Sequence, residues 1–371
     1  MIPAFARTVW TVSLLVAGAA SAHAQRWQIQ YFYDQDRSHL EIQDLQFPSA
    51  TRGIAVGSII DGKQERPASV VTSDGGAHWQ VLPLKEPPIS LFFLNESMGW
   101  LVTTKGIWQT QEMGKSWTKL PKPPGTVNRV YFTDDKNGWA LGPKKTVLET
   151  HDGGQKWEPL RVAAEQPGDP HYSAYTWIVF GSPKLGLITG WNIPPRDTPY
   201  ERPDWMDPQA ALHRKAAPHL SYTLYTQDGG NTWNHTSVSL FGVVSRIRMN
   251  SKGDGLGLME YELGFRYPSE AYFLDWTTGK NRSIYHDAHF AISDIWITAD
   301  GTAYLAGDVP PGQLNGVLPG RVQVLMSKDL AKWETIPVDY RAEALRTFLA
   351  APDNDNIWMA TNSGMILKLQ R

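Results

Sequence analysis

The stretch from Thr72 to Trp79 reads Thr-Ser-Asp-Gly-Gly-Ala-His-Trp and gathers several reactive side chains. It has the composition of an active-site loop, because Asp74 and His78 are residue types that transfer protons and His78 is also a type that binds metal ions. The two glycines would allow a tight backbone conformation. The first question is therefore whether this stretch performs chemistry or builds the fold.

The same pattern recurs along the chain, which indicates that it builds the fold. Clear copies occupy 150–157 and 226–233, a copy at 110–117 has Glu in place of Asp, and a shorter copy at 327–333 lacks the glycine. The first three tryptophans of the pattern are 38 and 40 residues apart, and the next gap is 76. A period near 40 in β-rich units predicts a β-propeller. The residues assigned to these turns are Thr72, Asp74, Gly76, Trp79, Thr110, Glu112, Gly114, Trp117, Thr150, Asp152, Gly154, Trp157, Thr226, Asp228, Gly230, Trp233, Asp329 and Trp333.

A second repeat, a turn followed by a strand of small and aromatic residues, precedes the turns and occurs seven times. The copy at 138–142 reads Gly-Trp-Ala-Leu-Gly, and this unit divides into four strands at 129–133, 138–141, 146–150 and 157–160. The last unit ends after three strands, so we expect residues 26–33 to supply its fourth strand and close the ring. The sequence therefore predicts an all-β fold, a seven-bladed β-propeller over residues 25–371.

The repeated turn can be explained without catalysis. Asp74 can fold its carboxylate back onto backbone N–H groups, and the Thr72 hydroxyl can bond locally. Gly76 permits a positive φ, and Trp79 can pack between neighbouring sheets. We predict no catalytic role for these residues, and we expect His78 to be a solvated turn residue that binds no metal.

The repeated turn resembles the Asp-box or BNR repeat, Ser/Thr-x-Asp-x-Gly-x-x-Trp, which is structural in sialidases, xyloglucanase-type glycosidases and sortilin-like receptors. The unit that combines 138–142 with 150–157 is typical of the photosystem II stability/assembly factor family, the Ycf48/HCF136 type. The resemblance covers essentially the whole mature chain. It implies an exported propeller that assists a membrane-protein complex through an arginine-rich surface. The photosynthetic members are often lipid-anchored through cysteine, which this chain lacks.

Long insertions indicate where a partner would bind. We place the segments 191–219, 59–67 and 308–320 between the second and third strands of blades 4, 1 and 6, on the face opposite the Asp-box turns, and long loops on a rigid scaffold often carry function. The 191–219 segment is rich in arginine and aromatic residues, which are enriched at interface hot spots, so we expect it to bind a partner. The alternative is that this segment is a lid packed on its own propeller. The candidate partner-binding residues are Arg196, Tyr200, Arg202, Trp205, Arg246, Arg248, Arg266 and Arg321.

The N-terminal 24 residues have the order of a secretory signal peptide. Arg7 precedes an apolar run that ends near Ala20, and the small-residue site Ala22-His23-Ala24 predicts cleavage after Ala24. The alternative, an uncleaved anchor, is disfavoured because the run is shorter than a membrane span. We expect a periplasmic or secreted monomer without a direct membrane anchor. The net charge of −2 gives no basic excess for nucleic acid.

The chain lacks the motifs of the usual enzyme classes. It has no GxSxG, HExxH or Walker-type loop, and it lacks the N-terminal arginine motif of sialidases. A glycosidase needs two facing carboxylates, and the spacing of Asp197, Glu201, Asp204 and Asp207 within one loop does not define such a pair. We therefore predict a non-catalytic assembly factor or docking scaffold for a membrane or envelope protein complex, with no cofactor. The alternative is a glycan-active or glycan-binding propeller, which as an enzyme would be a glycoside hydrolase.

Overall fold

The structure is a computed structural model that describes residues 25–35, 37–195, 217–262, 265–276, 278–310, 320–339 and 341–371. The predicted signal peptide, residues 1–24, lies outside the described residues, as does most of the 191–219 insertion. Within the described ranges, no helix has the length and hydropathy of a membrane span.

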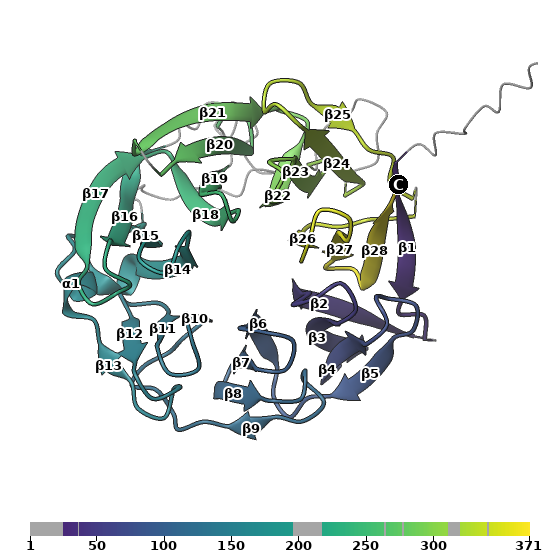
Figure 1. Cartoon of the computed structure of the whole chain (residues 1–371), viewed down its shortest axis with the longest axis horizontal. Helices are drawn as coiled ribbons and strands as arrows, with labels where there is room; N and C mark the ends of the chain where they lie inside the picture. The colour runs from purple at the N-terminus through teal and green to yellow at the C-terminus, as the bar shows by residue number, and fades with distance from the viewer. Residues whose placement is uncertain are drawn as a thin grey trace, which may run out of the picture.

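Seven four-stranded antiparallel sheets form a ring around a central channel (Figure 1), which confirms the predicted seven-bladed propeller. We call the strands of each blade a to d from the channel outwards. In that order, blades 1 to 7 contain β2 (Ser38–Gln46), β3 (Gly53–Asp61), β4 (Gln64–Thr72) and β5 (Gln80–Pro83); β6 (Pro88–Phe93), β7 (Gly99–Thr103), β8 (Gly106–Thr110) and β9 (Thr118–Lys119); β10 (Arg129–Phe132), β11 (Gly138–Leu141), β12 (Val147–Thr150) and β13 (Glu158–Pro159); β14 (Ser173–Phe180), β15 (Gly186–Asn192), β16 (His219–Thr226) and β17 (Asn234–Leu240); β18 (Gly242–Met249), β19 (Asp254–Tyr261), β20 (Ser269–Asp275) and β21 (Lys280–His286); β22 (Ala291–Ile297), β23 (Ala303–Asp308), β24 (Val322–Ser327) and β25 (Glu334–Thr335); and β26 (Thr347–Ala350), β27 (Trp358–Thr361), β28 (Met365–Gln370) and β1 (Arg26–Phe32).

The first strand of the described chain and the last one lie side by side in blade 7. β1 pairs antiparallel with β28, from Arg26 opposite Gln370 to Phe32 opposite Met365. Trp27 is 2% exposed and packs in the core between blades 6 and 7. The helix α1 (Arg161–Ala164) and a 3-10 turn at Pro170–Tyr172 connect blades 3 and 4.

Glycines in strand b allow the two innermost strands to approach closely. A Cβ on Gly57 would lie 2.0 Å from the Glu41 carbonyl oxygen, and one on Gly307 would lie 1.9 Å from that of Ala291. Both contacts occur beside a β-bulge in strand a, where the register shifts by one residue. At these two positions of strand b, only glycine fits against the bulge.

Aromatic residues fill the spaces between blades and hold the ring together. Phe132 of strand a stacks on Trp100 of the preceding blade at a centroid distance of 3.7 Å, and Trp157 meets the same ring edge-on at 6.1 Å. Trp358, Phe47 and Trp79 repeat this triplet between blades 7 and 1, and Trp139, Phe180 and Trp233 repeat it between blades 3 and 4. Stacked and edge-on pairs stabilise beyond the area they bury.

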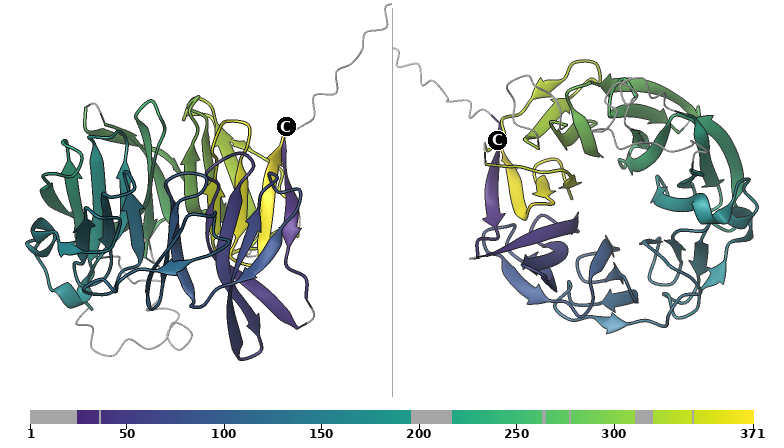
Figure 2. Two further views of the ribbon diagram at one scale, coloured as in Figure 1. Left: turned by 60° about the horizontal axis from the view of Figure 1, so that its bottom comes forward. Right: turned by 180° about the vertical axis from the view of Figure 1, so that it is seen from behind.

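The segment predicted as the blade 1 insertion is a β-hairpin. β3 and β4 continue through it, with Ile59 opposite Arg66 and Asp61 opposite Gln64, and Gly62 takes a φ of 60° in the turn. Its polar sequence suggested a loop, but pairing with both neighbours supports an extended conformation. With β2, the hairpin projects below the rest of the ring in the left view of Figure 2. This side carries the b–c connections and is called the b–c face.

Candidate functional site

The Asp-box turns use their reactive groups internally. The Thr72 hydroxyl donates to Asp74 at 2.9 Å and accepts from the Gly76 N–H at 2.9 Å, and the His78 N–H donates to Asp74 at 2.9 Å. Gly76 has a φ of 87°. Hydrogen bonds from the backbone and ring of His78 lower the pKa of Asp74 to about 2. The carboxylate therefore has its acceptor sites committed to the turn.

The other turns repeat this arrangement with small differences. Gly154 and Gly230 donate to the hydroxyls of Thr150 and Thr226 at 3.0 and 2.8 Å. In the degenerate copy, Gly114 still donates to Thr110 at 3.0 Å. The c–d connections that hold these boxes lie on the face opposite the b–c face, because successive connections alternate between the two ends of antiparallel strands.

The four candidate partner-binding residues that the structure describes lie in two different places. Arg196, Tyr200, Arg202 and Trp205 lie outside the described residues. Arg266 and Arg321 are exposed at b–c connections of blades 5 and 6.

Arg246 and Arg248 lie elsewhere than predicted. We expected them near the b–c face, but both belong to the inner strand β18 and their side chains are only 14% and 20% exposed. A bulge between Val244 and Arg246 shifts the register and turns both side chains toward the channel and blade 6. In this position they form a cluster that we call the channel cluster.

The channel cluster stacks three guanidinium groups around tryptophans of the inner strands. The guanidinium carbon of Arg129, on β10, lies 4.1 Å from the ring centroid of Trp177, on β14. Those of Arg246 and Arg248 lie 4.7 and 5.1 Å from the same ring, and Arg248 is also 4.7 Å from Trp296. Trp177 is fixed by a hydrogen bond from its Nε1 to the Ile247 carbonyl at 2.7 Å. A guanidinium cation is attracted to the face of an aromatic ring, and this attraction is stronger where water is excluded.

Two buried carboxylates partly neutralise these arginines. Asp294 is 1% exposed, accepts the N–H groups of Ile295 and Leu349 at 2.9 and 2.8 Å, and lies 3.8 and 3.5 Å from nitrogens of Arg246 and Arg248. Burial and the charges of Arg246 and Arg248 lower the pKa of Arg129 to about 10, while the charges of Asp44 and Asp294 oppose the change. Arg129 therefore remains a cation at neutral pH. With Asp44 as the second carboxylate, three arginines face two negative charges.

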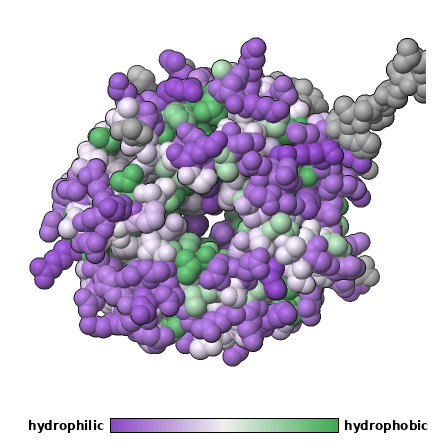
Figure 3. All heavy atoms as spheres, in the orientation of Figure 1, coloured by the Kyte–Doolittle hydropathy of each residue, from purple (hydrophilic) through white to green (hydrophobic). Residues whose placement is uncertain are grey.

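The surplus positive charge of the channel cluster favours an anion. The Nε of Arg248 is buried without a hydrogen-bond partner in the part of the chain that the structure describes. Figure 3 shows the channel as an opening at the centre of a mostly hydrophilic face. The chemistry of the channel cluster therefore suits a carboxylate held by planar guanidinium donors.

Sequence reasoning missed most of this cluster, although a simple signal was present. In five blades the residue nine positions before the start of strand b occupies the same place, and in blade 5 the equivalent residue lies nine positions before Gly255, the second residue of β19. These residues are Asp44, Ser90, Arg129, Trp177, Arg246 and Asp294. Aligning the blades on strand b would have placed the charges and the tryptophan in one layer.

Comparison with known proteins agrees with the predicted resemblance. Residues 123–188 match the family described as Photosynthesis system II assembly factor YCF48. A photosystem II assembly lipoprotein Ycf48 of Synechococcus sp. (strain CC9902) is 24% identical over 190 residues, 49% of this chain and 47% of the relative. The chloroplast photosystem II stability/assembly factor HCF136 of Guillardia theta is 44% identical over 57 residues, 15% of this chain and 14% of the relative. The chain thus matches less than half the length of either relative.

Solved structures agree in fold. A structure described as YCF48 bound to D1 peptide has a TM-score of 0.56 and 13% identity, covering 93% of this chain and all of the other. YCF48 from Cyanidioschyzon merolae has a TM-score of 0.58 and 14% identity, covering 93% and 99%. At these identities the likeness concerns the fold. The chain is an Asp-box propeller similar to the Ycf48 and HCF136 proteins, which confirms the resemblance predicted from its repeats.

Proposed function

We propose that this propeller is a non-catalytic assembly or docking factor that acts outside the cytoplasm on a membrane or envelope protein complex. Its channel cluster would hold a carboxylate-bearing peptide segment of a subunit. The observation that carries the proposal is the surplus of arginine over carboxylate around Trp177, with the unpartnered Nε of Arg248. Relatives named as photosystem II assembly factors, and a YCF48 bound to a D1 peptide, support a protein partner.

A binding role fits the state of the acidic groups better than hydrolysis does. Asp294 accepts two backbone N–H groups and faces two arginines, so its oxygens are occupied. Asp44 accepts the N–H groups of Leu45 and Leu91 in the same way. Glycoside hydrolysis requires a protonated acid opposite a free carboxylate across the sugar, and these two carboxylates are held by structural bonds instead.

The test is co-purification from envelope extracts. Arg246→Lys combined with Arg248→Lys keeps both charges but removes the planar fork that binds carboxylates. We expect the wild type and the control Arg161→Lys, at an exposed position of α1, to retain the same partner. The double variant should retain it at least about tenfold more weakly, the equivalent of about 1.4 kcal/mol.

A peptide experiment identifies the group that is recognised. A synthetic C-terminal peptide of the captured partner should bind as the free acid and bind more weakly as the amide. Capture of no specific partner by the wild type, or equal capture by all three proteins, would refute the proposal. Turnover of sialosides or β-glucans by the purified protein would favour the glycosidase alternative.

A further inference from the structure

The boundary between blades 4 and 5 differs from the other six. Hydrophobic clusters fill the boundaries between blades 6 and 7, 7 and 1, 1 and 2, 2 and 3, 3 and 4, and 5 and 6. In the described part of the chain we find no such cluster between blades 4 and 5. A cavity of about 650 Å³ occupies this boundary instead.

The cavity arises because the aromatic triplet is replaced by smaller side chains. Blade 5 has no Asp-box, and its c–d turn, between Asp275 and Lys280, is short. By strand register, Asn281 takes the place that Trp233 has in blade 4. By the same register, Met249 replaces Phe180 and Leu187 replaces Trp139. All three substitutions remove volume from one boundary, and an apolar space of this size is not filled by its own neighbours.

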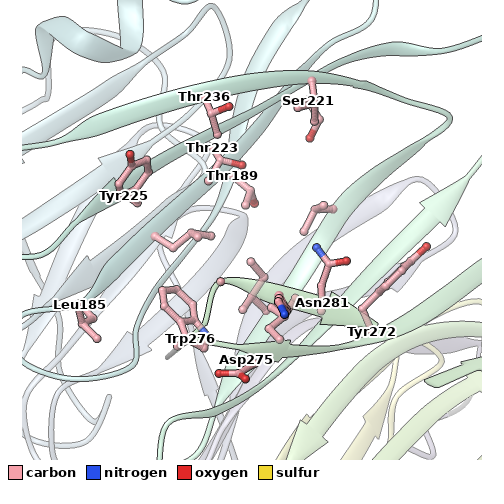
Figure 4. Close-up of a pocket in the computed structure, with 18 of the residues that line it drawn as sticks. Leu185, Thr189, Ser221, Thr223, Tyr225, Thr236, Tyr272, Asp275, Trp276 and Asn281 are labelled. Atoms are coloured by element: carbon pink, nitrogen blue, oxygen red, sulfur yellow. The ribbon is translucent and has the colours of Figure 1, made fainter. Parts of the chain in front are cut away.

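The two walls of the cavity have different chemistry (Figure 4). Blade 5 contributes mainly apolar side chains, among them Val244, Met259, Leu274 and Trp276, the last of which is labelled in Figure 4. Blade 4 contributes a group of hydroxyls along adjacent strands. These residues are Thr189, Ser221, Thr223 and Thr236.

Two polar side chains that line the cavity could bond to a ligand. Thr189 is 2% exposed, and its hydroxyl has no hydrogen-bond partner among the described residues. The amide of Asn281 points toward the cavity in Figure 4. A buried hydroxyl without a partner is costly unless a ligand or water supplies one. The lining includes only one lysine and one aspartate, Lys280 and Asp275, so it does not select strongly for charge.

We propose that this cavity, which we call the inter-blade cavity, binds an uncharged and mostly apolar small molecule that carries at least one oxygen. Its volume lies within the range of about 300–1,000 Å³ that small-molecule sites occupy, and such sites combine an apolar lining with a few placed polar groups. An acyl ester and a ring compound with a carbonyl share this chemistry. The site is separate from the channel cluster, so it does not depend on the proposed peptide binding.

The test uses the neutral fluorophore N-phenyl-1-naphthylamine as the probe. The purified wild type should enhance its fluorescence, and methyl octanoate or methyl benzoate should displace it, which distinguishes a chain from a ring. Asn281→Trp reinstates the missing tryptophan and should weaken probe binding at least about tenfold, as blocking an apolar pocket does. It should leave the thermal midpoint unchanged or raised.

A second pair of variants guards against misfolding of the first. Val238 is 49% exposed on β17 and lines the cavity, whereas Val81 is 40% exposed on β5 of blade 1. Val238→Trp should weaken probe binding and Val81→Trp should not. Absence of probe binding by the wild type, equal binding by all variants, or displacement by glucose but by neither ester would overturn the proposal.

Discussion

Replacing Asp294 by asparagine should separate the backbone role of this carboxylate from its charge. Asparagine keeps one acceptor oxygen and places an NH2 group against the second backbone N–H. A buried N–H left without an acceptor costs about 1–3 kcal/mol. Asp294 also lies within 4 Å of both Arg246 and Arg248, and breaking a buried charge pair raises the total loss to about 3–5 kcal/mol.

Asp44 provides the matched control. It has the corresponding position in blade 1 and accepts the Leu45 and Leu91 N–H groups at 2.9 Å each. Among the described residues, no arginine nitrogen lies within ion-pair range of Asp44, and its charge acts on Arg129 only from a greater distance. Asp44→Asn should therefore lose mainly the backbone part, about 1–3 kcal/mol. The difference between the two variants, about 2 kcal/mol, measures the arginine contribution.

The assay is equilibrium urea unfolding followed by tryptophan fluorescence, with midpoints compared at equal slopes. The midpoint of Asp294→Asn should fall further than that of Asp44→Asn, and the gap should narrow when Arg246 and Arg248 are both changed to methionine. Equal midpoints for the two aspartate variants would show that the arginines do not depend on Asp294, and the electrostatic account of the channel cluster would be wrong.

Three further predictions concern pH, the Asp-box and the turns. Burial raises the pKa of Asp308 from 3.8 to about 6, so the folded state binds this proton more tightly than the unfolded state and the free energy of unfolding falls as pH rises from about 4 to 6. The loss amounts to about 3 kcal/mol, and Asp308→Asn should abolish it when urea midpoints at pH 4 and pH 8 are compared. An unchanged pH dependence in the variant would contradict this prediction. Thr150→Val leaves the Gly154 N–H without its acceptor and should lower the free energy of unfolding, measured by thermal unfolding, by about 1–3 kcal/mol. Thr150→Ser keeps the hydroxyl and should lower it by less. Equal losses for the two variants would show that the hydroxyl does not stabilise the turn. Gly230 and Gly253 have φ of 92° and 88°, but of the two only Gly230 would place a Cβ against a tryptophan ring, at 2.2 Å. Gly230→Ala should therefore lower the free energy of unfolding by about 1–3 kcal/mol more than Gly253→Ala does. Similar losses for the two variants would mean that the ring moves aside.

The repeats determined the fold because each unit carries its own turns and its own strand b. The number of blades could be counted from seven such strands, and the face of the Asp-box turns followed from strand order. The channel cluster could not be placed in this way, because its bonds join distant blades: Trp177 bonds Ile247 and Asp294 bonds Leu349, 70 and 55 residues apart. The bulge before Arg246 also reverses the side-chain alternation that a reader would extrapolate along the strand.

Two other features were only partly visible in the sequence. The polar hairpin between β3 and β4 has a loop-like composition, and only its pairing makes it a strand. The sequence has no Asp-box copy between residues 233 and 327, but the cavity that results was not predicted from it. A missing tryptophan leaves a cavity only if the neighbouring side chains do not fill its space. Here these are Leu187 of blade 4 and Met249 of blade 5.

The boundary between blades 4 and 5 makes the ring mechanically uneven. Its inner end is fastened by the bond from Trp177 to Ile247 and by the stacked arginines, while its outer end lacks the aromatic packing of the other boundaries. On heating, blades 4 and 5 should therefore separate first at their outer strands, while their inner strands stay in contact and act as a hinge. Amide hydrogens of β17 and β21 should then exchange sooner than those of inner strands. A molecule wedged in the rim would stiffen that hinge and so restrict the inner strands on which the channel cluster lies.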